Sequence, residues 1–132
     1  MFSILNSLKG KQLKTRLLNP RDQFFDLLLG VNTFGYKHYS DNRKDPVWKG
    51  DYEPCRYKDL FKLLRHADVG PETVFVDFGC GLGRAVFGAN HLKASKSIGV
   101  EFDKDLYQGA ETNRLKSKPL DNMNRPRCSR HF

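Results

Sequence analysis

The chain has 132 residues, which suffices for one domain at most. Hydrophobic residues make up 39% of it, with ten Phe and five Tyr, so the composition is that of a folded rather than a disordered chain. No run of about 18 apolar residues occurs, which argues against a membrane span. The formal net charge of +8 allows an anionic partner such as nucleic acid, but no dense Lys/Arg block is present and charge alone does not establish one.

The cysteines and histidines indicate neither a disulfide framework nor a metal site. Cys55, Cys80 and Cys128 are odd in number and widely spaced, without a CxxC pair, and the four histidines lack HExxH or comparable spacing. We therefore predict no metal and a reducing, cytoplasmic location. Cys80 could be imagined as a nucleophile, but a small residue tolerated at a close backbone approach is the better interpretation.

The sequence predicts a helix over residues 1–19, and a short helix followed by an irregular loop over residues 20–54. Residues 1–19 combine Lys and Arg with spaced Leu and Ile and no acidic residue, which predicts a basic amphipathic helix on the domain's edge; a presequence or a membrane-surface helix shows a similar pattern. Residues 20–54 begin with a short helix that Gly30 closes. An aromatic-rich loop follows, and we expect it to act as an ordered cover, although its aromatic side chains could equally pack into the core.

Residues 55–116 alternate between helix and strand patterns. Apolar residues recur at helical spacing over 55–67, and the β-rich run over 73–78 reads as a buried strand. A helix over 83–92, a strand over 97–102 and a helix from the N-cap Asp103 to about Lys116 follow. This order predicts an α/β, Rossmann-like fold with a partial parallel sheet, right-handed crossovers and helices on both sides.

Residues 117–132 show almost no apolar periodicity and are predicted to form a loose basic tail. Only two parallel strands then fit after Val74, because a βαβ unit takes roughly 30 residues. Two strands make a poor parallel sheet. We therefore expect the chain to be a truncated form of a longer domain, with an exposed sheet edge that would invite association.

The segment VFVDFGCGLGRA places three glycines directly after the first strand and opens a helix. Glycines let a ligand approach bare backbone, and a helix N-terminus offers free N–H groups. A dinucleotide fingerprint would need Gly or Ala at position 84, where Arg84 would crowd the helix–strand packing or project outward, so NAD or FAD is disfavoured. No Gly-Lys-Ser/Thr follows, so the segment is not a P-loop either.

Two acidic residues indicate a ligand other than a dinucleotide or a nucleoside triphosphate. Asp77 ends the first strand and would repel a pyrophosphate, whereas it suits a cationic amino group. Glu101 ends the second strand, where a carboxylate can accept hydrogen bonds from ribose hydroxyls. A nucleoside with a cationic, phosphate-free tail satisfies these features, and S-adenosyl-L-methionine is such a molecule.

The pattern VFVDFGCGLGRA…IGVEFD resembles motif I and the following acidic strand end of class I S-adenosylmethionine-dependent methyltransferases, over roughly residues 24–116. The resemblance implies that Asp77 receives the amino group of the cofactor and that Glu101 binds its ribose. It implies that the methionyl part of the cofactor approaches Gly79, Gly81 and Gly83. It further implies that the adenine packs on Phe102 and that Tyr52 and Pro54 line a lid over the methionine end. For Tyr52, Pro54 and Phe102, packing into the core is an equally good interpretation.

The resemblance leaves the methyl acceptor open, because the sequence shows no candidate for an acceptor site or a catalytic residue. A small molecule, a protein or a nucleic acid would each be compatible. A different class of function is a non-catalytic basic binding module for nucleic acid or an anionic surface, which keeps the Rossmann-like corner only structurally. A nicotinamide-dependent oxidoreductase is the weakest alternative, because of Arg84.

Overall fold

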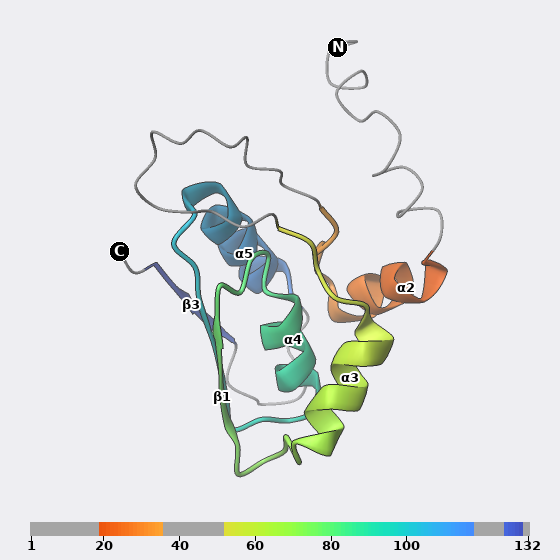
Figure 1. Ribbon diagram of the computed structural model, residues 1–132. Coiled ribbons are helices and arrows are strands. Elements are labelled where there is room, and N and C mark those ends of the chain that lie inside the picture. The colour runs from red at the N-terminus through yellow and green to blue at the C-terminus, as the bar shows by residue number, and fades with distance from the viewer. Residues whose placement is uncertain (1–18, 36–51, 118–125, 131–132) are drawn as a thin grey trace, which may run out of the picture.

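The computed structural model describes residues 19–35, 52–117 and 126–130, which are coloured in Figure 1. The helix predicted over residues 1–19 and most of the aromatic loop therefore lie outside the described residues. The elements along the chain are α2 (Pro20–Leu29), α3 (Tyr57–His66), β1 (Val74–Phe78), α4 (Arg84–His91), β2 (Lys96–Val100), α5 (Lys104–Lys116) and β3 (Arg127–Ser129).

The three strands form one parallel sheet in the order β1-β2-β3. The register aligns Asp77 of β1 with Gly99 of β2, and Gly99 with Cys128 of β3. Helices α4 and α5 are the crossover connections between neighbouring strands (Figure 1). The predicted α/β fold with a parallel sheet is confirmed.

Local signals in the sequence set the helix ends. Pro20 occupies the first turn of α2, where its missing N–H costs nothing, and Gly30 ends the helix with the left-handed φ of 71°. The side chain of Asp103 accepts hydrogen bonds from the backbone N–H groups of Asp105 and Leu106 at the start of α5, 3.0 Å each. The predicted ends of these two helices are therefore confirmed.

The prediction that only two parallel strands fit was wrong. Residues 127–129, inside the segment expected to be a loose tail, form β3 and pair with β2. The strand is three residues long and carries no apolar alternation, so the sequence pattern alone does not reveal it. Its pairing with β2 depends on backbone hydrogen bonds, including the one that the Glu101 N–H donates to the Ser129 carbonyl oxygen at 3.1 Å.

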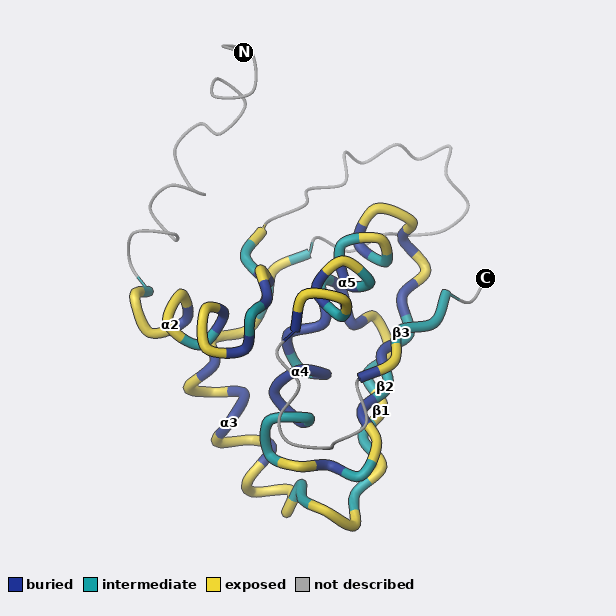
Figure 2. Tube along the Cα trace, turned by 180° about the vertical axis from the view of Figure 1, so that it is seen from behind, coloured by how far each residue is buried: buried dark blue, intermediate teal, exposed yellow. Residues whose placement is uncertain are grey.

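The core lies between the helices, on one side of the sheet. Helix α4 packs on β1 and β2, α3 packs on α4, and α2 packs on α3. Figure 2 shows the buried residues gathered along these contacts. The buried apolar cluster is formed by Leu29, Val31, Tyr57, Leu60, Phe61, Leu64, Phe87, Ala89 and Ala94.

The opposite side of the sheet is open in the described part of the chain. On β1, Val74, Val76 and Phe78 are 56%, 42% and 82% exposed, whereas Phe75 between them packs against the core. All described helices lie on the core side in both views (Figures 1 and 2), so the expectation of helices on both sides is met on one side only. No described helix is long and apolar enough to cross a membrane.

Candidate functional site

The glycine turn, residues 79–83, connects β1 to α4 and lies against the end of β2. The backbone N–H groups of Gly79 and Cys80 both donate to the Val100 carbonyl oxygen, at 2.8 and 3.1 Å. Gly79, Gly81 and Gly83 adopt φ values of 79°, 56° and 91°, a region that L side chains rarely enter. The turn therefore requires glycine for its backbone path, as the sequence pattern predicted.

Two of these glycines face different surroundings. A Cβ atom at Gly79 would meet nothing within 4 Å, and Gly79 is exposed. A Cβ atom at Gly81 would lie 2.1 Å from Cε2 of Tyr52, so the Tyr52 ring rests directly on the Gly81 backbone. The turn is consequently open at its first glycine and covered at its second.

Tyr52 is held in this position by its hydroxyl, which donates to the Thr33 carbonyl oxygen at 3.1 Å. Burial raises the pKa of Tyr52 well above its ordinary value, so the phenol stays protonated at neutral pH. The structure thus brings Tyr52 to the glycine turn. Pro54 is half-buried two residues further along the same segment, which leads into α3.

Glu101 follows β2 and is 4% exposed. Its Oε2 accepts a hydrogen bond from the Gly81 N–H, and its Oε1 accepts one from the Asp103 N–H, both at 2.8 Å. These two bonds fix the carboxylate beside the glycine turn. Phe102, the next residue, is 41% exposed at the same end of the sheet.

Asp77 lies at the carboxyl end of β1, on the core side of the sheet, and is half-buried. Burial raises the pKa of the Asp77 carboxyl, and the nearby Glu101 carboxylate raises it further. Two carboxylates at one end of a parallel sheet create a negative potential that a cation would relieve. The structure therefore brings Asp77, Glu101 and the glycine turn together.

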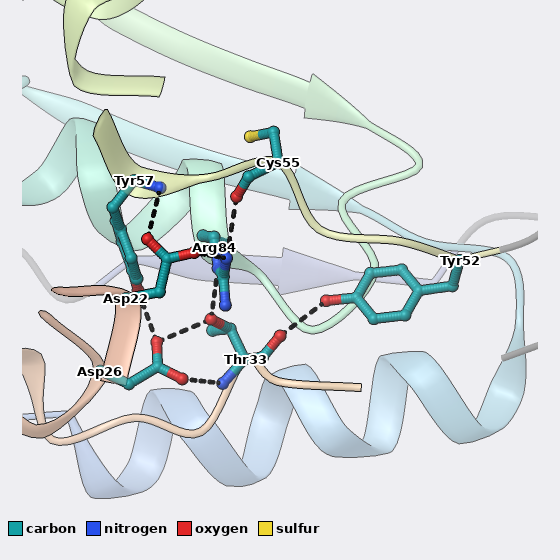
Figure 3. A network of polar contacts seen from close by, with 7 residues as sticks. All are labelled: Asp22, Asp26, Thr33, Tyr52, Cys55, Tyr57 and Arg84. Atoms are coloured by element: carbon teal, nitrogen blue, oxygen red, sulfur yellow. Dashed lines mark hydrogen bonds and ion pairs between the residues drawn. The ribbon is translucent and has the colours of Figure 1, made fainter. Parts of the chain in front are cut away.

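Arg84, the first residue of α4, is 4% exposed and points into the protein (Figure 3). Its Nη1 forms an ion pair with Asp22 at 3.3 Å and donates to the Cys55 carbonyl oxygen at 2.8 Å. Its Nε donates to Thr33 Oγ1 at 2.7 Å. The expectation that Arg84 would crowd the packing or project outward was wrong, because α2 provides a buried carboxylate for it.

A second carboxylate of α2 completes this polar network. Asp26 accepts hydrogen bonds from the Thr33 N–H, the Thr33 hydroxyl and the Tyr57 hydroxyl, each at 2.7 Å. The Asp22 carboxylate also accepts from the Tyr57 N–H at 3.0 Å. Figure 3 shows how these contacts join α2, the start of α3 and the start of α4.

The sequence pattern did not predict this network, although one signal was present. Asp22 and Asp26 lie four residues apart, on one face of a short helix. Both are buried, at 4% and 5% exposure. Buried carboxylates need partners, so an i,i+4 acidic pair on the inner face of α2 indicates a buried cation or several donors nearby.

Comparison with known proteins identifies the family. Residues 50–123 match the family described as "Histone methylation protein DOT1". Relatives named "Histone-lysine N-methyltransferase, H3 lysine-79 specific" occur in Cryptococcus neoformans, at 35% identity over 66 residues, and in Dictyostelium discoideum, at 33% identity over 96 residues. No solved structure matches the chain.

The family match covers more than half of the chain, so the chain belongs to the DOT1 family. This family is consistent with the Rossmann-like methyltransferase fold. The matched segments cover 49% and 65% of this chain, but only 10% and 5% of the Cryptococcus and Dictyostelium proteins. The chain therefore spans a tenth or less of the length of these relatives.

Proposed function

We propose that this chain forms the S-adenosyl-L-methionine-binding part of a histone-lysine methyltransferase. The observation that carries the proposal is the pairing of a half-buried Asp77 with Glu101 around an exposed Gly79. Membership in the DOT1 family supports the reaction class. The names of the relatives support a histone lysine as the methyl acceptor.

Asp77 fits the ammonium group of the cofactor. Its carboxylate makes no hydrogen bond within the described part of the chain, and the pKa of this carboxyl is raised by burial and by Glu101. A bound ammonium would favour the charged form of this carboxyl and relieve its repulsion from Glu101. We assign the methionyl part to Gly79, Gly81 and Gly83, of which Gly79 is open, since a Cβ there would meet nothing within 4 Å, while Tyr52 covers Gly81 and Phe87 covers Gly83.

Glu101 fits the ribose. Each of its oxygens accepts one backbone hydrogen bond, which leaves a second lone pair on each for a ribose hydroxyl. The backbone bonds hold the carboxylate ready for that contact. Phe102 exposes an aromatic ring next to Glu101, on which the adenine would pack.

Tyr52 and Pro54 would form the lid over the methionine end. The Tyr52 ring already covers Gly81, so a ligand at this glycine would have to share the space with it or displace it. The hydroxyl bond from Tyr52 to Thr33 joins the lid to the Arg84 network. The position of the Tyr52 ring would therefore depend on the hydrogen bonds between Thr33 and Arg84 being intact.

The bound cofactor would supply a methyl group activated by a sulfonium centre. The acceptor would be an uncharged lysine amine, and catalysis would come mainly from holding the two in line. We assign described residues only to the cofactor and none of them to the acceptor. A histone acceptor would place the protein on chromatin, in contrast to the cytoplasmic location expected from its cysteines.

Isothermal titration calorimetry of the full chain with S-adenosylhomocysteine tests this proposal. We expect one saturable site, and no heat with NAD, because Arg84 occupies the position where a dinucleotide fold needs a small residue. Glu101→Gln should abolish the binding, while Glu72→Gln, at an exposed position outside the site, should leave it unchanged. Absence of binding, combined with salt-sensitive binding of duplex DNA, would instead support the basic binding module.

A further inference from the structure

Three residues form one row across the sheet on its core side. Asp77, Gly99 and Cys128 are aligned in register on β1, β2 and β3. Aligned residues of parallel strands point to the same side of the sheet. Gly99 and Cys128 therefore face the side of the sheet on which α4 packs against β2 and α5 against β3.

The side chain of Cys80 occupies the place that Gly99 leaves empty. A Cβ atom at Gly99 would lie 2.6 Å from Cys80 Sγ and 3.0 Å from Cys80 Cβ. The sulfur atom of Cys80 thus rests on Gly99, one strand away from Cys128. Strands in a sheet are about 4.8 Å apart, so the two cysteine side chains are neighbours.

The two neighbouring thiols affect each other's titration. Neither cysteine is in a disulfide, and the Cys80 thiol donates a long hydrogen bond to the Gly81 carbonyl oxygen, at 3.8 Å. The proximity of the two thiols lowers the pKa of Cys128 and raises the pKa of Cys80. Cys128 is half-buried while Cys80 is 5% exposed, so Cys128 is the thiol that a small oxidant reaches.

We propose that Cys80 and Cys128 are a redox-active pair that forms an intramolecular disulfide with hydrogen peroxide and thereby locks the glycine turn to β3. The Cys128 sulfur attacks one peroxide oxygen, the O–O bond breaks, and water leaves, giving a sulfenic acid. The Cys80 sulfur then attacks the Cys128 sulfur, and the sulfenic oxygen leaves as a second water. In sum, two thiols and one peroxide give one disulfide and two waters.

This modification would act on the candidate site through the backbone. Cys80 lies between Gly79 and Gly81, and its N–H is bonded to the end of β2. A covalent bond from Cys80 to β3 would restrict the turn against movement away from the sheet. The pair itself is defined by the fold and does not depend on the cofactor.

Mass spectrometry of the full chain tests the proposal. The native protein is treated with equimolar hydrogen peroxide, the remaining thiols are blocked with N-ethylmaleimide, and the digest is analysed without reduction. We expect a Cys80–Cys128 link, two hydrogen atoms lighter than the separate peptides, with Cys55 fully alkylated. The link should form at a rate independent of protein concentration and should disappear with dithiothreitol.

The controls separate the folded geometry from chance pairing. Cys55→Ser should leave the link intact, and Cys128→Ser should remove it without forming a Cys55–Cys80 link. In urea, the shorter loop should favour the Cys55–Cys80 link instead, because loop closure costs less for fewer residues. Alkylation of both Cys80 and Cys128 after oxidation, or a native link that involves Cys55 or a second chain, would overturn the proposal.

Discussion

The carboxylate of Glu101, at the end of β2, accepts a 2.8 Å hydrogen bond from the backbone N–H of Gly81 in the turn that follows β1. The bond spans the two strand ends at the point where a nucleoside would lie in an open α/β sheet. One side chain thus positions the turn and offers its remaining lone pairs to a ligand. Glu101 therefore contributes both to the stability of the fold and to the proposed binding of the ligand.

Substituting Glu101 with Gln should therefore reduce both properties. The amide keeps one acceptor oxygen and places an NH2 donor where the carboxylate accepted a backbone N–H, which leaves buried donors facing each other. We expect a loss of about 1–3 kcal/mol in the free energy of unfolding, measured with urea. The matched control is Glu111→Gln, whose pair with Arg114 is partly exposed and should cost less than about 1 kcal/mol. Equal losses in the two variants would contradict this account.

Alanine at two glycines of the turn should separate backbone strain from contact with Tyr52. Both Gly79 and Gly81 have positive φ, so each Ala variant carries a strain of roughly 1–2 kcal/mol. Only the Cβ at position 81 would also collide with the Tyr52 ring. We expect Gly81→Ala to be less stable than Gly79→Ala in urea unfolding.

The Tyr52→Ala background checks the cause of that difference. Removing the ring should bring the two glycine variants to the same loss relative to their common parent. If Gly81→Ala remains more destabilising than Gly79→Ala in the Tyr52→Ala background, contact with the Tyr52 ring does not cause the difference.

The glycine turn, the caps of α2 and α5 and the order of strands and helices from α2 to α5 could be predicted from the sequence. Each depends on local chemistry, such as the positive φ of Gly83 or the Asp103 carboxylate at a helix start. The burial of Arg84 could not be predicted, because its partner Asp22 is far away in the sequence. Asp22 reaches Arg84 only through the packing of α2 on α3. The three-residue β3 could not be predicted either, because it forms by pairing with β2 and its own sequence has no strand pattern.

Asp77→Asn should stabilise the chain at neutral pH and weaken ligand binding. Because the folded pKa of Asp77 lies above its ordinary value of 3.8, the folded state binds the proton more tightly than the unfolded state. Stability therefore falls as pH rises from the ordinary value through the raised pKa, and the penalty persists at neutral pH. Asn carries no charge and avoids it.

Thermal unfolding at two pH values measures this effect. We expect Asp77→Asn to raise Tm at pH 7 relative to the parent chain, with the gain disappearing below the ordinary pKa. Asp68→Asn is the control, since Asp68 is exposed and Asn tolerates its left-handed φ of 50°. A lower Tm for Asp77→Asn at pH 7 would show that this carboxylate stabilises the fold.

Arg84→Met should strongly destabilise the chain. The substitution leaves the buried Asp22 carboxylate without its cation, and removing one partner of a buried ion pair costs about 3–5 kcal/mol. Asp22→Asn in the same chain keeps an acceptor for the Tyr57 N–H and removes the unpaired charge. The double variant should therefore be more stable than Arg84→Met alone, as urea unfolding would show. If both are equally unstable, charge pairing is not the role of Arg84.

The most direct measurement is a backbone amide NMR titration of the full chain with S-adenosylhomocysteine. Binding at the proposed site predicts saturable shifts centred on residues 77–83 and 101–103, where Asp77, the glycine turn and Glu101 meet. The Asp77→Asn and Glu101→Gln variants should lose these shifts while keeping a dispersed spectrum. A dispersed parent spectrum that does not change, or shifts confined to residues outside these two segments, would contradict the proposed function.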